Sequence, residues 1–336
     1  MRPWASALPT IIVGTMWRDL EQVGPEGVCE RVSKSLDAGF CVFDTAPLYG
    51  YGRIEEWLGA SLRGREEQAL VLGKVGLRWD SDHGDVLYRE VSTDGISRVV
   101  RRDSRPQSVR ADVEGSLRRL QRERLDLVQV HQRDRHVPLA ETLGELAHLR
   151  EEGKVDRIGL SNFSQADIEE ALATKVPLET HQIEYSLLSR EAGGGTCMVT
   201  AASGMGLLAY STTGAGLLGG RAAMERAGGS AYAAEVLRRS DAELRPVAES
   251  LGLAVAQLAI LWTISQPGVA GAVVGMRTDG QLAAASALRG RTLSGDDARA
   301  IEGVFRGLTL KLDETWFARL KSRAARAARA VNRRIR

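Results

Sequence analysis

The stretch "CVFDTAPLYGYG" (residues 41–52) places a carboxylate directly after a short apolar run and a tyrosine five residues later. Asp44 follows Val42 and Phe43, and Tyr49 stands in a turn that contains Pro47 and two glycines. This pattern is typical of a buried strand that ends in a polar loop. Taken alone it fits a capped turn as well as half of a catalytic site, so the rest of the chain must decide.

Seven further apolar runs share this form, and each is followed by a turn. The eight runs lie at residues 10–14, 41–44, 70–75, 127–131, 157–161, 181–185, 206–211 and 271–275. Because they are almost continuously apolar, we expect parallel strands that are buried on both faces. Eight strands that alternate with helices predict a closed α/β barrel, a (β/α)8 or TIM barrel, as a single domain over residues 1–318.

The segments between the runs show helical spacing. Two clear examples have apolar residues at Val109, Val113, Leu117 and Leu120, and at Leu139, Leu143, Leu146 and Leu149. Gly153 is expected to end the second helix, and Ser164 to cap the N-terminus of the next one. The pattern therefore supports a helix after each strand.

Two connections are too long to be simple turns. One follows the third strand (residues 76–107), and the other follows the seventh (residues 211–241). Both begin at the carboxyl end of a strand, where barrel enzymes carry their active sites. We therefore expect long loops that cover a ligand.

The charge of the chain is unevenly distributed. Residues 319–336 carry eight basic side chains and no acidic one, so they contribute +8 to a total of +2. Residues 1–318 therefore carry about −6, and the tail is expected to form a basic C-terminal helix or a flexible tail. We do not expect nucleic acid as a partner, because the body has no basic stripe that would extend the contact.

The apolar runs and the cysteines indicate the compartment. No apolar stretch approaches the roughly 18 residues of a membrane helix. Cys29, Cys41 and Cys197 follow no ligand spacing and are expected to be reduced thiols. We therefore expect a cytoplasmic protein with no membrane contact, and the oligomeric state stays open.

Polar residues stand at the ends of adjacent strands: Asp44 after the second, Lys74 after the third and His131 after the fourth, with Tyr49 nearby. This set suits proton donation to a carbonyl. A lysine beside a phenol lowers the pKa of the phenol, a carboxylate holds the lysine, and a histidine can donate to the substrate oxygen.

Two rival patterns are weaker. "GAGLLG" (residues 214–219) matches a dinucleotide fingerprint, but no strand-like run follows within a compact βαβ unit. "HQRDRH" (residues 131–136) offers metal ligands, but the five histidines contain no His-x-His or His-x3-His pair. We therefore expect no metal site.

Four motifs together resemble the aldo-keto reductase family: "FDTAPLYGYGRIEEWLGASL", "LVLGKVG", "SLRRLQRERLDLVQVHQRD" and "GKVDRIGLSNFS". The chain is similar to the bacterial branch with a long loop after the third strand. The resemblance implies nicotinamide-dependent reduction of an aldehyde or ketone, such as a sugar or natural-product carbonyl. It implies that Tyr49 is the proton donor, that Lys74 lowers its pKa, that Asp44 pairs with Lys74, and that His131 orients the carbonyl.

The resemblance also implies a set of cofactor contacts: Thr15, Met16, Asp44, Ser161, Asn162, Gln182, Tyr210, Ser211, Thr212, Gly216, Leu217, Arg221, Gly275, Arg277 and Gln281. Arg277 would bind a 2′-phosphate, which favours NADPH (NADP+), with NADH as the alternative.

The substrate, a small-molecule carbonyl compound, is less well defined. Trp17, Tyr51, Trp79 and His83 could line its pocket. Four arginines, at positions 98, 101, 102 and 105, are interpreted first as a solvated face and second as a phosphate contact. Two alternatives stay open: a sugar or aldose dehydrogenase that runs in the oxidative direction, and a cofactor-binding regulatory barrel without turnover.

Overall fold

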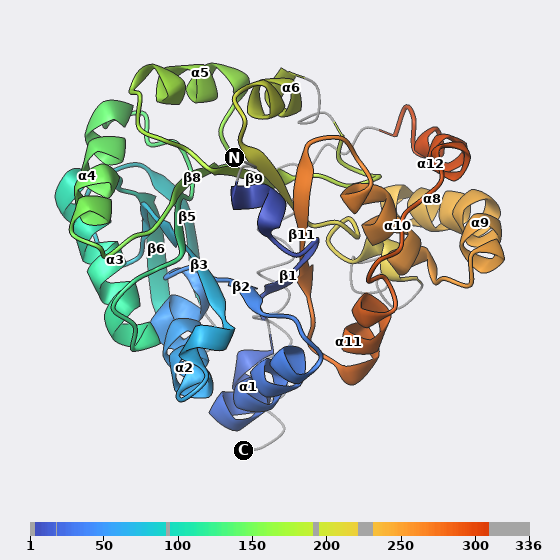
Figure 1. Cartoon of the computed structure of the whole chain (residues 1–336), viewed down its shortest axis with the longest axis horizontal. Coiled ribbons are helices and arrows are strands. Elements are labelled where there is room, and N and C mark those ends of the chain that lie inside the picture. The colour runs from blue at the N-terminus through green and yellow to red at the C-terminus, as the bar shows by residue number, and fades with distance from the viewer. Residues whose placement is uncertain (1–3, 18, 92–94, 191–194, 221–230, 309–336) are drawn as a thin grey trace.

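A closed barrel of parallel strands forms the centre of the protein (Figure 1). The computed structural model describes residues 4–17, 19–91, 95–190, 195–220 and 231–308. Within these residues, the barrel strands in chain order are β1 (Ile11–Gly14), β2 (Val42–Asp44), β3 (Leu70–Val75), β7 (Leu127–Val130), β8 (Ile158–Ser161), β9 (Thr180–Glu184), β10 (Gly206–Tyr210) and β11 (Val269–Gly275). They coincide with the eight predicted runs, so the predicted (β/α)8 barrel is confirmed.

Helices connect successive strands and lie around the outside of the barrel (Figure 1). They are α1 (Leu20–Asp37), α2 (Arg53–Leu62), α3 (Pro106–Leu120), α4 (Leu139–Glu151), α5 (Gln165–Ala173), α6 (Gly195–Ala202), α8 (Ala231–Arg239), α9 (Arg245–Ser250), α10 (Val255–Ile264), α11 (Asp279–Ser286) and α12 (Gly295–Glu302). The two helices predicted from apolar spacing are α3 and α4. Ser164 caps α5 in a capping box with Asp167, as expected.

The interior of the barrel changes from apolar to polar along its axis. At the N-terminal end, one cluster joins the fully or largely buried side chains of Leu8, Ile12, Val42, Leu72, Leu127 and Leu208. The 3-10 helix η1 (Trp4–Ala7) comes just before this cluster. Because side chains two apart in a strand share a face, the next inward positions are Gly14, Asp44, Lys74, Gln129 and Tyr210. The polar layer therefore lies at the carboxyl ends of the strands.

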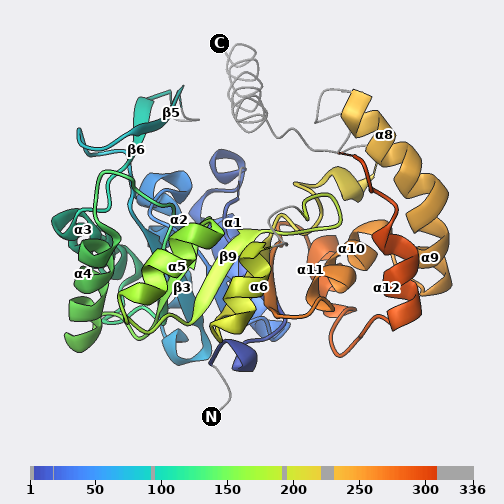
Figure 2. The ribbon, with the colours of Figure 1, turned by 90° about the horizontal axis from the view of Figure 1, so that it is seen from above.

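The segment after β3 differs from the predicted loop. It folds into an antiparallel sheet in the order β4 (Leu77–Arg78), β6 (Ser97–Arg102) and β5 (Val86–Val91). β5 and β6 stand clear of the barrel, on the side away from the N-terminus (Figure 2). The long connection lies where it was predicted. Its strands were not foreseen because they expose much of their surface, and their sequence is too polar to look like a buried strand.

The segment after β10 is also more regular than predicted. Residues 212–216 form turns, η5 (Leu217–Gly219) follows, and helix α8 already begins at Ala231. A short π-helix, η6 (Ser240–Leu244), joins α8 to α9. The predicted cofactor contact Arg221 and the basic tail at residues 319–336 lie outside the described residues, so the proposed domain limit at residue 318 stays a prediction.

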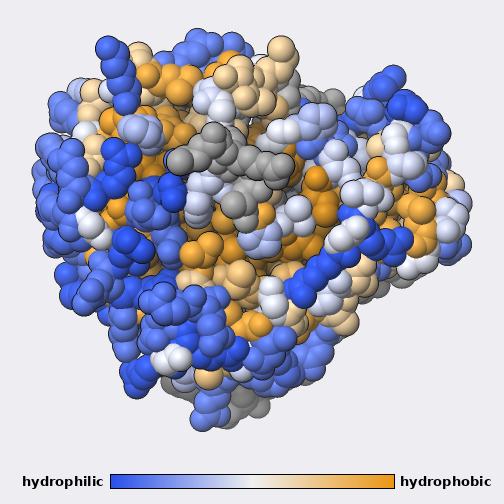
Figure 3. Space-filling view, viewed as in Figure 1, coloured by the Kyte–Doolittle hydropathy of each residue, from blue (hydrophilic) through white to orange (hydrophobic). Residues whose placement is uncertain are grey.

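The described surface is mixed in polarity. In the view of Figure 3, hydrophilic residues cover much of the margin, and apolar residues gather toward the middle. In the described part of the chain, no single helix is long and apolar enough to cross a membrane. One pair of helical segments, Ala231–Ser250 and Val255–Ile264, is long and apolar enough when taken together, with a bend of 76° between the two. The three cysteines are free thiols.

Gly59 allows α2 and α3 to approach closely. A Cβ at this position would lie 2.6 Å from backbone atoms of Leu120. We therefore expect Gly59→Ala to lower the free energy of unfolding by about 1–3 kcal/mol, as overpacking does. Gly144→Ala in α4 is the matched control, because no atom lies within 4 Å of its Cβ. It should be neutral or stabilising by up to about 1 kcal/mol. Equal effects of the two changes in urea unfolding would contradict this interpretation.

Candidate active site

A buried ion pair lies in the polar layer of the barrel. The Lys74 ammonium donates to both carboxylate oxygens of Asp44, each at 2.7 Å, and to the carbonyl oxygen of Thr45 at 3.2 Å. The side chains are only 1% and 3% exposed. An ammonium has three N–H donors, so these three acceptors use all of them. The pair is therefore held in one geometry, as a buried charge requires.

Tyr49 and His131 lie beside this pair. The Lys74 ammonium is 5.3 Å from the centroid of the Tyr49 ring. The rings of Tyr49 and His131 are 6.2 Å apart in an edge-to-face arrangement. The backbone N–H of His131 donates to Val75 at the end of β3, which fixes the start of its loop. The structure thus brings all four predicted catalytic residues to one rim.

Burial acts on the titration of both Tyr49 and Lys74 in the resting site. Burial raises the pKa of the Tyr49 phenol well above its usual value, and the charge of Asp44 adds to this effect. Burial also lowers the pKa of Lys74, while the charge and hydrogen bonds of Asp44 act against that shift. The resting phenol is therefore protonated near neutral pH. Lys74 directs its donors to Asp44 and Thr45, and its predicted lowering of the Tyr49 pKa stays a prediction.

Amide side chains extend the polar layer across the barrel. The Gln182 amide donates to Asp44 at 2.7 Å and lies 3.4 Å from the amide oxygen of Gln129. Asn162 donates to the carbonyl oxygen of His131 at 3.0 Å and accepts the Tyr210 hydroxyl hydrogen at 2.7 Å. These contacts join the ends of β2, β7, β8, β9 and β10 into one hydrogen-bonded layer.

A buried histidine supports the loop that carries Asn162. Asn162 has a φ of 59°, in the left-handed region that non-glycine residues seldom adopt. The next N–H, of Phe163, donates to Nε2 of His181 at 3.2 Å, and Nδ1 of His181 faces the Thr200 hydroxyl at 3.2 Å. Burial lowers the pKa of His181 to about 3, so the ring is neutral and its Nε2 can accept. His181 therefore anchors this turn to α6.

The predicted cofactor residues near β1 and β10 have different exposures. Thr15 is buried, and its hydroxyl and N–H both donate to the carbonyl oxygen of Asp44. Met16 is 48% exposed. After β10, Ser211 has a φ of 54°, and the chain then turns back on itself through hydrogen bonds such as Gly216 to Thr213. Thr212 and Leu217 are buried, and Ser161 is also buried at the end of β8.

The predicted contacts after β11 lie at the surface. Gly275 and Arg277 are exposed, and the Arg277 N–H donates to the Gln281 side chain at 2.8 Å. The positive charge of Arg277 acts on the carboxylate of Asp19. Burial raises the pKa of Asp19, but hydrogen bonding and charge from Arg31 hold it below its usual value, and Arg277 adds to this lowering.

These residues fit a nicotinamide dinucleotide. Asn162 and Gln182 carry amide groups of the kind that can bind a carboxamide, and both lie in the polar layer. A Cβ on Gly216 or on Gly275 would meet no atom within 4 Å, so both glycines leave open space on the rim. The exposed Arg277 guanidinium makes no ion pair with the described residues. Its fork of donors suits a phosphate group.

The four residues predicted to line the substrate pocket differ in burial and in their contacts. Trp17 is buried in the main core, with the Arg31 guanidinium 5.6 Å from its ring. Tyr51 and Trp79 contact each other edge to face at 5.5 Å. His83 is exposed and pairs with Asp82. Direct contacts among the described residues therefore link two of the four, Tyr51 and Trp79.

The arginines of the insertion serve mainly to hold it together. Arg101 donates to the carbonyl oxygen of Gly84, and Arg102 to the side chain of Gln132. Arg105 forms a two-point contact with Asp103. Arg98 lies over the Tyr51 ring at 4.2 Å. These contacts favour neither of the two predicted roles, the solvated face or the phosphate site, because the side chains bind protein groups.

Two residues near the rim were missed by sequence reasoning. Glu184 pairs in register with Tyr210, and burial raises its pKa to about 7. Its position two residues after Gln182 on one strand face could have revealed it. Tyr88 of β5 is close enough for the charge of Tyr49 to act on it, in addition to burial, which raises its pKa. No signal pointed to Tyr88, because the insertion was interpreted as a loop.

Metal-ligand geometry is absent from the described residues. They contain no group of three or more His, Cys, Asp or Glu side chains placed to hold a metal ion. The Asp134 carboxylate, which stands within "HQRDRH", accepts the N–H groups of Ser104 and His136. It therefore serves the backbone around it.

Comparisons with known sequences give a consistent result. The sequence model of the Aldo/keto reductase family matches residues 10–306. The chain is 32% identical over 313 residues to aldo-keto reductase YhdN of Bacillus subtilis, covering 87% of each protein. It is 30% identical to the uncharacterized oxidoreductase YrpG of the same organism, covering 75% of this chain and 78% of the relative.

Solved structures agree on the architecture. The glycerol dehydrogenase AKR11B4 from Gluconobacter oxydans is 28% identical with a TM-score of 0.74, and the match covers 89% of this chain and 91% of that one. An aldo/keto reductase from Klebsiella pneumoniae, solved in complex with NADP and acetate, has a TM-score of 0.67 over 89% and 92% of the two chains. At 22% identity, the second similarity shows the fold alone.

The buried His181 should make stability depend on pH. The unfolded histidine takes up a proton near pH 6.5, whereas the folded one does so only near pH 3. Between these values the unfolded state binds more protons, so stability falls as the pH falls. From pH 7 to pH 5, wild type should lose about 2 kcal/mol more than His181→Gln in urea unfolding. Parallel losses in the two proteins would contradict a neutral, buried ring.

Proposed function

The chain belongs to the aldo/keto reductase family, and on that basis we propose that it reduces the carbonyl group of a small aldehyde or ketone to an alcohol with NADPH. The observation that carries this proposal is the cluster of Asp44, Lys74, Tyr49 and His131 at the carboxyl ends of adjacent strands. In a barrel of this type, that rim is where substrates bind. A cytoplasmic setting is part of the proposal, in line with the three free thiols.

Tyr49 is the proposed proton donor. Its phenol stays protonated near neutral pH, because burial and Asp44 both raise its pKa. When bound, the reduced nicotinamide would supply the hydride for the carbonyl carbon. The Tyr49 hydroxyl then gives its proton to the carbonyl oxygen, on which negative charge develops. The ring of His131, 6.2 Å from that of Tyr49, is placed to orient the same oxygen.

Lys74 and Asp44 have a supporting role in this proposal. Their closely spaced opposite charges form a fixed dipole near the Tyr49 ring. As the phenol loses its proton, the ammonium 5.3 Å from the ring stabilises the phenolate. The pair therefore acts on the charge that develops during the reaction.

The remaining polar layer is proposed to hold the cofactor. Ser161, Asn162 and Gln182 would bind the carboxamide, and the ring of Tyr210 would stack on the nicotinamide. The turns after β10, including Gly216, would cover the pyrophosphate. Arg277 would bind the 2′-phosphate, which is why we propose NADPH over NADH.

Oxidation of a sugar or polyol is the second candidate. The similarity to a glycerol dehydrogenase favours it, since that enzyme is named for the oxidation of an alcohol. In this direction Tyr49 would act as the base, because the same residues serve both directions of the reaction. Comparing kcat/KM for aldehyde reduction and alcohol oxidation at pH 7 decides between them, and a faster oxidation would contradict our choice.

Removal of the proposed proton donor should abolish turnover. We expect Tyr49→Phe to lower kcat by about 10²–10⁴-fold, the range typical of general acids, while NADPH still quenches tryptophan fluorescence with a similar Kd. Tyr185→Phe is the control, because Tyr185 stacks on Trp262. It should keep kcat within about twofold. A Tyr49→Phe protein with wild-type turnover would contradict the proposal and favour a regulatory barrel.

Loss of the Arg277 guanidinium should weaken one cofactor selectively. A charge-assisted contact contributes about 1.5–3 kcal/mol, so Arg277→Ala should raise the Kd for NADPH about 10–100-fold. The Kd for NADH should stay nearly constant, because it has no 2′-phosphate. Fluorescence titration measures both constants. Equal losses for the two cofactors would contradict the role of Arg277 in phosphate binding.

A further inference from the structure

The turn that carries Tyr49 has an unusual backbone. The three residues that follow it, Gly50, Tyr51 and Gly52, have φ angles of 60°, 57° and 90°. Glycine adopts such angles readily, but tyrosine does so at a cost of about 1–2 kcal/mol. A residue in this conformation persists only where its surroundings hold it. The side chain of Tyr51 must therefore have contacts that offset this cost.

Those contacts come from the β4–β5–β6 insertion. The Tyr51 hydroxyl donates to the carboxylate of Glu90 on β5. The guanidinium of Arg98 on β6 lies 4.2 Å from the centre of the Tyr51 ring, and Trp79 contacts the ring edge to face. Glu90 and Arg98 are direct neighbours across the β5–β6 pair. The phenol is thus enclosed by the insertion on several sides.

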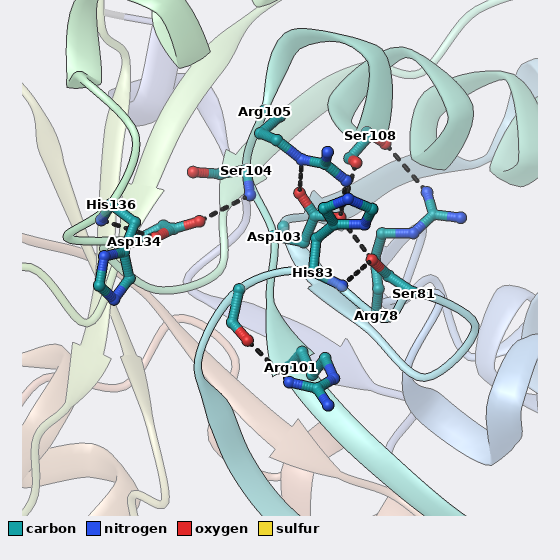
Figure 4. Close-up of polar contacts among 12 residues, drawn as sticks. Arg78, Ser81, His83, Arg101, Asp103, Ser104, Arg105, Ser108, Asp134 and His136 are labelled. Atoms are coloured by element: carbon teal, nitrogen blue, oxygen red, sulfur yellow. Dashed lines mark hydrogen bonds and ion pairs between the residues drawn. The ribbon is translucent and has the colours of Figure 1, made fainter.

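The insertion is itself fixed to the barrel at its base (Figure 4). The buried Asp103 accepts hydrogen bonds from Ser81, Arg105 and Ser108 at 2.6–2.9 Å. Asp112 of α3, also buried, accepts from the Gly76 N–H at 2.8 Å and from Arg78 at 2.9 Å. Because charged groups and backbone are paired here, the base of the insertion is a firm support for the contacts to Tyr51.

The same face of β5 also reaches toward Tyr49. Tyr88 stands two residues before Glu90, so both side chains lie on one face of the strand. The electrostatic effect of Tyr49 on Tyr88 shows that the two phenols are near each other. β5 thus carries one residue that contacts Tyr51 and a second that lies within electrostatic reach of Tyr49.

We propose that Tyr51 is a positioning residue, which locks the turn of Tyr49 against the insertion and so fixes the orientation of the proton donor. This inference rests on the proposed function, in which Tyr49 delivers the proton. Glu90 and Arg98 hold Tyr51, while Gly50 and Gly52 let the backbone pass through the required angles. The insertion thus takes part in catalysis without contributing a group that reacts.

Two variants remove the contact from opposite sides. Tyr51→Phe deletes the hydroxyl and keeps the ring under Arg98, and Glu90→Ala deletes the acceptor. We expect each to slow single-turnover hydride transfer from NADPH to para-nitrobenzaldehyde about 10–100-fold, since small misplacements of reacting groups cost this much. The double variant should be no slower than either single variant, because one contact is lost in all three. Glu90→Gln, which keeps an acceptor oxygen, should recover most of the rate.

Arg89→Ala is the matched control, because Arg89 is exposed on the other face of β5. It should leave the rate unchanged. Hydrogen exchange provides a readout that does not depend on turnover: the amides of residues 49–52 should exchange faster in Tyr51→Phe, with the Kd for NADPH unaltered. Wild-type exchange and hydride transfer in Tyr51→Phe would overturn the inference and leave the proposed function standing. Full turnover in Tyr49→Phe would instead overturn the proposed function, while the exchange result still tests the contact.

Discussion

The buried contact between Lys74 and Asp44 is the constraint on which the rest of the rim depends. Two opposite charges lie inside the barrel, and every donor of the ammonium has an acceptor. A charge in this position without its partner would be strongly destabilising. The carboxylate also receives the amide of Gln182, and the backbone carbonyl of Asp44 receives two donors from Thr15. One residue pair thus joins the ends of β1, β2, β3 and β9 and gives the site its shape.

The contacts of Lys74 bear on the proton transfer that we propose for Tyr49. The donors of Lys74 are committed to Asp44 and Thr45, and burial raises the pKa of the Tyr49 phenol, so the resting phenol is neutral. In the proposed reaction, Tyr49 supplies the proton and the Lys74 cation stabilises the phenolate as it forms. Around this centre the turn of residues 49–52 is strained, and the insertion after β3 offsets the strain through Tyr51.

Much of the fold and part of the site could be predicted from the sequence. Strands such as 41–44 and 70–75 are buried on both faces, so their apolar runs are visible in the sequence, and residues at their ends must share one rim. The insertion was misjudged because β5 and β6 expose polar side chains and pair with each other. Sequence position shows that Lys74 is near Tyr49 but not which acceptors use its donors, so the contacts of Lys74 to Asp44 and Thr45 needed the structure. Tyr88 was missed because it lies on β5, whose exposed, polar sequence does not look like a buried strand.

The most direct test of the central claim is a double-mutant cycle on Asp44→Asn and Lys74→Met, with the free energy of unfolding measured in urea. Each single change leaves one buried group without its charged partner and should cost about 3–5 kcal/mol. The double change removes both, so the account predicts a smaller loss than the sum of the two, by several kcal/mol. Losses that simply add would contradict it, because the two residues would then stabilise the barrel independently.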